Sequence, residues 1–172
     1  MVATALGLML FPAMMAFAAS SDLLTMTISN RVSLTLIGGF FLFALVIGMS
    51  GNTMLWHIGA GCMVLAIAFG CFAMRWIGGG DAKLAAATAL WFGFDHLLPY
   101  LFYASLFGGA LTLLLLSFRT LPLPLPLPPY LAAQQWVQRL HDKKGGVPYG
   151  IALAAAALLV YPDTLWMQAV PA

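Results

Sequence analysis

The sequence has very little charge. Of its 172 residues, 7% are charged and 63% are hydrophobic, whereas a soluble domain carries roughly 25% charged residues to keep its surface solvated. Seven basic and five acidic side chains cannot cover a soluble protein of this length. The shortage argues against a soluble domain, a disordered chain and a nucleic-acid-binding protein. We therefore expect lipid to surround most of the chain.

Acidic groups and thiols are especially scarce. There is no Glu, and the two cysteines, Cys62 and Cys71, lie in one apolar run. Nine residues apart on a helix, they would face opposite sides about 13 Å apart along the axis, too far for a disulfide. No Cys/His cluster has the spacing of a metal site, so we expect neither a metal nor a cofactor. The three histidines show no convergent pattern: His57, His96 and His141.

Six apolar runs predict helices that cross a bilayer, since about 20 residues are needed for a span. The fourth run is short and turns around Gly93 to His96. We expect an all-α, polytopic integral membrane bundle of about six helices, forming a single domain over residues 1–172. The spans cover approximately residues 2–19, 32–49, 53–74, 82–96, 98–118 and 149–167.

The basic residues predict the orientation of the bundle, because Lys and Arg are retained on the cytoplasmic side. If the N-terminus lies outside, six crossings place all seven of them inside. The first run has an alternative interpretation as a signal peptide cleaved near Ala16–Ala18. That interpretation is disfavoured, because a signal peptide opens with positive charge and no basic residue precedes Arg31. The seven are Arg31, Arg75, Lys83, Arg119, Arg139, Lys143 and Lys144.

A polar segment, residues 119–146, separates the last two runs. The alternating prolines of 121–129 predict a stiff polyproline II strut of about 25 Å, for which a spacer is a simpler role than partner docking. Residues 130–144 have apolar side chains at helical spacing, with basic residues close by. This pattern predicts a helix that lies on the anionic inner leaflet.

Two of the five aspartates are predicted to lie at the same membrane boundary. Two crossings separate Asp22 from Asp81, so both return to the inner side. Either one alone would most simply cap a helix, but ionisable groups at membrane depth are costly and often functional. Together they favour a catalytic pair, in which the charged carboxylate takes a proton from water while the protonated one donates to a peptide carbonyl. Lys83 could bias this pair or simply reach the lipid headgroups.

Three segments then resemble one protein family. Residues 78–84, Gly-Gly-Gly-Asp-Ala-Lys-Leu, resemble the Gly-x-Gly-Asp motif of intramembrane aspartyl peptidases in its prepilin peptidase form. Residues 22–31 resemble the first catalytic segment of that family, an Asp followed by an Ile-Pro-Asn turn, with Ser29 in place of the Pro. Residues 147–153 resemble its last signature, in which the closing span begins with Pro, an aromatic residue and Gly.

The resemblance implies a type IV prepilin peptidase, in the small single-domain form of tight-adherence (Flp) pilus systems. Such an aspartic endopeptidase removes the basic leader from pilin precursors at the inner face of the bacterial cytoplasmic membrane. Asp22 and Asp81 match the two catalytic residues. The loops are too short for the cysteine-containing insert of two-activity members, so N-methylation of the pilin is in doubt. The supporting motif matches Gly78, Gly80, Lys83 and Asn30.

The implied partners are a pilin precursor and the lipid bilayer, with no nucleic acid, and the oligomeric state stays open. One alternative is a non-enzymatic, proton-coupled transport subunit that uses Asp22 and Asp81 as relays. A transporter should place such acids near the bilayer midplane, among broken helices. Because both acids are predicted at one edge, the peptidase is favoured.

Overall fold

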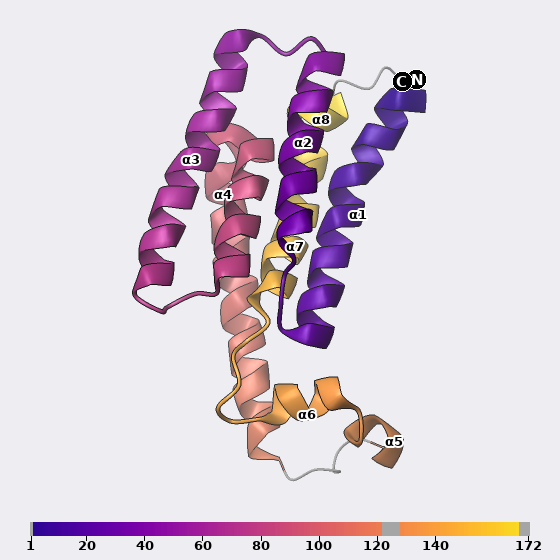
Figure 1. Ribbon diagram of the computed structural model, residues 1–172, viewed down its shortest axis with the longest axis vertical. Helices are drawn as coiled ribbons and strands as arrows, with labels where there is room; N and C mark the ends of the chain where they lie inside the picture. Colours follow the sequence, from indigo (N-terminus) through magenta and orange to yellow (C-terminus); the bar gives the residue numbers. More distant parts are fainter. Residues whose placement is uncertain (1, 122–127, 169–172) are drawn as a thin grey trace.

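The computed structural model describes residues 2–121 and 128–168, and this part of the chain is helical with short connections. Figure 1 shows the long helices side by side in a bundle, with two short helices, α5 and α6, beyond one end. The predicted all-α class is confirmed. The elements are α1 (Val2–Thr25), α2 (Asn30–Val46), α3 (Gly51–Ala73), α4 (Gly79–Thr120), α5 (Pro129–Ala132), α6 (Gln135–His141), α7 (Tyr149–Val160), the 3₁₀ turn η1 (Tyr161–Asp163) and α8 (Leu165–Gln168).

Helix α4 consists of two arms that meet at Gly93, whose φ of 61° and ψ of −170° are not helical. The rings of Phe92 and Tyr100 lie 5.3 Å apart, although eight residues of straight helix would separate them by about 12 Å along the axis. In Figure 1 the second arm passes behind the first and continues to the end where α6 lies. The turn predicted near Gly93 is therefore present.

Two side chains bond the carbonyl groups next to this kink. His57 Nδ1 donates to the carbonyl oxygen of Leu90 at 2.8 Å, and Trp166 Nε1 donates to that of Trp91 at 2.6 Å. A kink disrupts helical hydrogen bonds, and an unpaired backbone group is costly in lipid. His57, to which the sequence assigned no role, thus stabilises the turn between the two arms.

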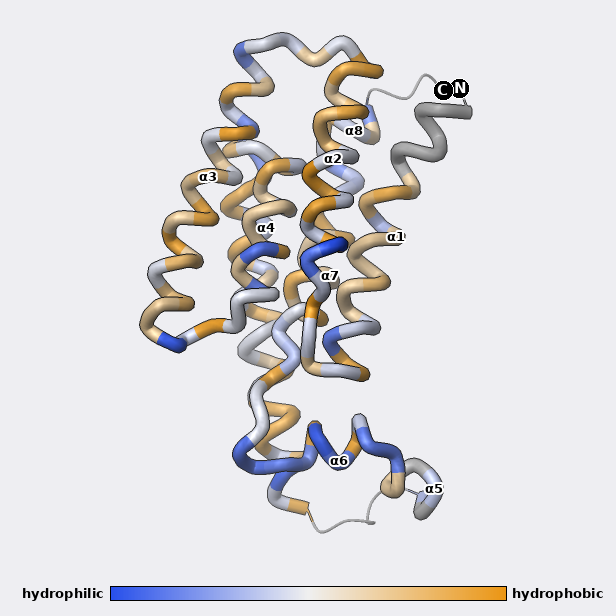
Figure 2. The backbone as a smooth tube through the Cα atoms, viewed as in Figure 1, coloured by the Kyte–Doolittle hydropathy of each residue, from blue (hydrophilic) through white to orange (hydrophobic). Residues whose placement is uncertain are grey.

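The bundle has the surface of a membrane protein. Large apolar side chains such as Leu45 (73% exposed) and Leu98 (77% exposed) point outward, and Figure 2 shows hydrophilic residues concentrated around α6 while the long helices are mostly hydrophobic. Three described helical stretches are long and apolar enough to cross a bilayer, and two shorter ones are apolar. The long ones are Gly51–Ala73, Gly79–Thr120 and Tyr149–Gln168; the shorter are Met9–Thr25 and Asn30–Val46.

The helices do not coincide residue by residue with the predicted spans. Helix α1 continues to Thr25 instead of ending at residue 19, so Asp22 lies within its last turn. The last predicted span, 149–167, agrees with the stretch Tyr149–Gln168, but this stretch is not one continuous helix, because α7 ends at Val160 and is followed by η1 and α8. Pro162 has no backbone N–H to continue the helix, and Thr164 is extended.

The polar segment also differs from the prediction. Its expected helix over 130–144 is broken into α5 and α6, because Gln134 is extended, with ψ of 134°. Val137 and Leu140 are buried within the protein, whereas Ala133 is exposed. Most of the predicted proline strut, residues 122–127, lies outside the described residues.

Candidate active site

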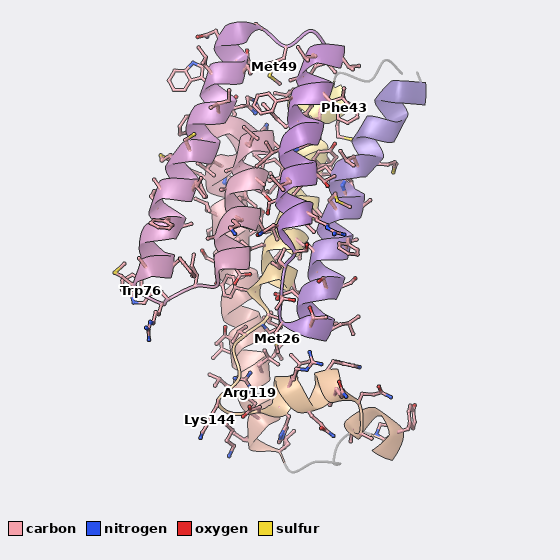
Figure 3. All side chains as sticks on the ribbon, viewed as in Figure 1. Met26, Phe43, Met49, Trp76, Arg119 and Lys144 are labelled. Carbon is pink, nitrogen blue, oxygen red and sulfur yellow. The ribbon has the colours of Figure 1, made fainter. Side chains whose placement is uncertain are left out.

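Asp22 and Asp81 line one cavity of about 290 Å³, together with residues 26–28 and 78–80. Asp22 comes from the last turn of α1 and is only 5% exposed, while Asp81 belongs to the first turn of α4. The two carboxyl groups are close enough to interact electrostatically. In Figure 3, Met26 and Trp76, which lie near them in the sequence, occupy the end of the bundle that faces α6.

The start of α7 holds the Asp22 carboxylate. The backbone N–H of Gly150 donates to Asp22 Oδ2 at 2.7 Å, and the first N–H groups of a helix have no partner within it. A Cβ on Gly150 would lie 2.8 Å from this oxygen and 2.7 Å from Cδ1 of Ile28. Only glycine permits so close an approach. Gly150 is not among the site residues predicted from the sequence, although it lies in the segment 147–153 that resembles the last signature of the family.

Glycines also shape the approach to Asp81. The N-cap residue of α4 is Gly78, so Asp81 is the third helical residue and its carboxylate reaches back toward the Gly78 backbone, as in a capping box. A Cβ on Gly78 would lie 2.9 Å from Asp81 Oδ2, and one on Gly80 would lie 3.1 Å from Cβ of Ile28. The first and third glycines of the motif thus admit the carboxylate and the 26–28 turn.

The two polar members of the supporting motif bond to each other. Lys83 Nζ donates to Oδ1 of Asn30 at 2.9 Å, which joins the start of α4 to the start of α2. Two residues apart on a helix, Lys83 and Asp81 point in directions about 200° apart. Lys83 therefore connects two helices, and neither of the roles considered from the sequence describes this contact.

Ser29 occupies the position of the expected proline. Its backbone, with φ of −65° and ψ of 140°, has the φ that a proline ring imposes. Its hydroxyl accepts a hydrogen bond from the N–H of Arg31 at 3.3 Å and caps α2. The substitution therefore keeps the shape of the turn.

The other aspartates lie away from this cavity. Asp95 lines a separate cavity of about 320 Å³ beside His57 and Gly93. Asp142 accepts a hydrogen bond from the backbone N–H of Lys144 at 2.9 Å, and Asp163 is exposed in η1. Among the described residues, no group of three or more His, Cys, Asp or Glu side chains could hold a metal ion, and both cysteines are free.

A comparison with known families fits this geometry. The model of the type IV leader peptidase family matches residues 9–113, a stretch that contains both Asp22 and Asp81 and covers more than half of the chain. No curated protein and no solved structure matches. The chain belongs to the type IV leader peptidase family, a family of aspartic-type peptidases.

Proposed function

We propose that this protein is a prepilin leader peptidase, which cuts the basic leader from type IV or Flp pilin precursors at the cytoplasmic boundary of the bacterial inner membrane. One observation carries the proposal: Asp22 and Asp81, from two different helices, line one cavity at one end of an apolar bundle. The family match supports the general activity. The substrate and the site of cleavage are our inference.

The two carboxyl groups would hydrolyse a peptide bond by general acid–base catalysis. Two neighbouring carboxyl groups share one proton. The ionised group takes a proton from water as the water oxygen attacks the carbonyl carbon, and the protonated group donates to the carbonyl oxygen. The product of this attack is a tetrahedral diol. The carboxyl group that took the proton from water then gives it to the leaving nitrogen, while the other carboxylate takes a proton from a diol hydroxyl. The C–N bond breaks, and the pair again holds one proton.

The place of the cavity fits a substrate that is half soluble and half apolar. A pilin precursor presents its basic leader to the cytosol and an apolar helix to the membrane, so its scissile bond lies at the boundary. The cavity is lined by the connection between α1 and α2 and by the start of α4, at the end of the bundle that faces α6, around which Figure 2 shows hydrophilic residues. A transport subunit would instead need acids near the middle of the bilayer, and the bundle end is a poor place for such relays.

The proposal requires six crossings with the N-terminus outside. A reporter inserted after Arg75 or Lys144 should be active in the cytosol, and one placed after Gly51 or Ala172 should be active outside, because the basic residues favour the inner side. Alkaline phosphatase and a fluorescent protein, which work on opposite sides, would provide the two readouts. A cytosolic signal from the fusion after Ala172 would contradict the six-span topology.

The direct test is cleavage by the purified protein in liposomes. A pilin precursor should yield the free leader and the mature pilin, identified by mass spectrometry, and EDTA should not change the rate because the mechanism uses only carboxyl groups and water. Proton flux across the liposomes without any cleavage would instead support the transport subunit.

A further inference from the structure

A larger groove lies on the other side of α4 from the two aspartates. It has a volume of about 540 Å³ and is almost entirely apolar. Helices α2 and α3 both pack against α4 but hardly against each other, so they form the two walls and the first arm of α4 forms the floor (Figure 1). Several of the lining side chains are exposed, including Leu34 (66%) and Leu65 (46%). The groove therefore opens toward lipid.

The dimensions of the groove suit one face of a helix. Along α2 it extends from Asn30 to Phe41, which is about 16 Å or three turns. Its floor carries Ala86 and Ala87, and Gly61 lies at the foot of the α3 wall. In a membrane such small residues let a second helix approach closely.

The cytoplasmic end of the groove is polar and adjoins the catalytic cavity. Asn30 and Lys83 lie at this end, each two residues after a residue that lines the cavity, Ile28 and Asp81. Gly79 and Gly80, which line the cavity, precede Lys83 by one turn of α4, and Phe72 and Ile28 pack against them. An extended residue spans about 3.3 Å, so a few residues of a peptide would connect the groove to the carboxyl groups.

We propose that this groove receives the apolar helix of the substrate, whose chain then passes Asn30 and Lys83 to reach Asp22 and Asp81. The proposal rests on the proposed function, because the occupant is the precursor that the peptidase cuts. A substrate that unwinds at the membrane boundary exposes unpaired N–H and C=O groups. The amide oxygen of Asn30 can accept a hydrogen bond from such an N–H group, and the ammonium group of Lys83 can donate one to such a C=O group.

The native cysteines allow a direct test, because Cys62 lines the groove while Cys71, on the same helix, does not. Single cysteines are placed along three turns of the precursor helix, and disulfides are formed in membranes that contain the Asp81→Asn protein. Cross-links should recur every three or four positions of the precursor. They should vanish with Cys62→Ala and persist with Cys71→Ala. Cross-linking through Cys71 alone, or none at all, would overturn the proposal.

A kinetic test uses the active protein. Cys62→Trp should fill the groove and raise KM by about tenfold or more with little change in kcat, because it removes binding common to the ground and transition states. Ile67→Trp, on the outer surface of α3 (61% exposed), is the matched control and should change neither constant. If Cys62→Trp and Ile67→Trp have the same KM and kcat, the groove holds lipid and not the substrate helix, which would contradict the proposal.

The two tests separate this inference from the proposed function. Cross-linking needs no turnover. Suppose that cross-links form through Cys62 but the protein that keeps Asp81 never cleaves the precursor. This result would support binding of the helix in the groove and refute the proposed peptidase activity. Normal cleavage with no cross-link and an unchanged KM in Cys62→Trp would refute the groove and leave the peptidase standing.

Discussion

Replacing either Asp22 or Asp81 with Asn should lower the rate of precursor cleavage by several powers of ten, while the protein stays in the membrane at normal abundance. Asn has nearly the same shape, and its side-chain oxygen can still accept the hydrogen bond from Gly150 that Asp22 accepts at 2.7 Å. A capping role should therefore survive. Asn cannot exchange a proton, so acid–base catalysis should fail. The rate is measured as released leader, and abundance by immunoblot of washed membranes.

The double variant should be about as inactive as either single one, because residues that act as a unit are not additive. Asp95→Asn, Asp142→Asn and Asp163→Asn are matched controls, since these side chains lie away from the cavity, and they should retain activity. If Asp22→Asn or Asp81→Asn processes the precursor at a near-normal rate, the two-carboxylate mechanism is wrong.

The sequence predicts the features of this molecule that depend on short-range patterns. Long apolar runs predict helices in lipid, and the polar stretch from 119 to 146 marks the segment beyond the bundle. The meeting of Asp22 and Asp81 at one end also follows from simple counting, because two crossings return the chain to the same side. The structure brings both into one cavity.

Contacts between distant segments could not be predicted in the same way. The bond from Gly150 to Asp22 joins residues 128 positions apart, and helical periodicity contains no information about which span packs against which. The same limit applies to His57, whose bond to the Leu90 carbonyl has meaning only once α4 turns at Gly93. The groove likewise exists because α2 and α3 both pack on α4, a relation that no single run reveals.

The glycines show how sequence and structure complement each other here. The motif at 78–80 is recognisable from the sequence, but the reason for it is steric: the Asp81 carboxylate and the 26–28 turn lie where side chains on Gly78 and Gly80 would project. Gly150 likewise leaves room for the Asp22 carboxylate and for Ile28. At all three positions the absence of a side chain lets another part of the protein come close. We therefore expect the geometry of the carboxyl pair to depend on these glycines.

Gly150→Ala should therefore reduce kcat by about 100-fold or more, since a displacement of reacting groups by about 1 Å is sufficient for such a loss. The new methyl group would lie 2.8 Å from Asp22 Oδ2 and 2.7 Å from Cδ1 of Ile28. Something must move, and the carboxylate that bonds to the N–H of the same residue cannot stay in place. The kcat for precursor cleavage measures the effect.

Gly109→Ala is the matched control, because a Cβ at Gly109 meets nothing within 4 Å and its kcat should stay normal. In a helix, Ala is more favourable than Gly by about 1 kcal/mol, so neither variant should lose helical structure, which circular dichroism in detergent would verify. A normal kcat for Gly150→Ala would show that the cavity tolerates a shifted Asp22. The close approach of α7 would then support the fold without positioning the carboxylate for catalysis.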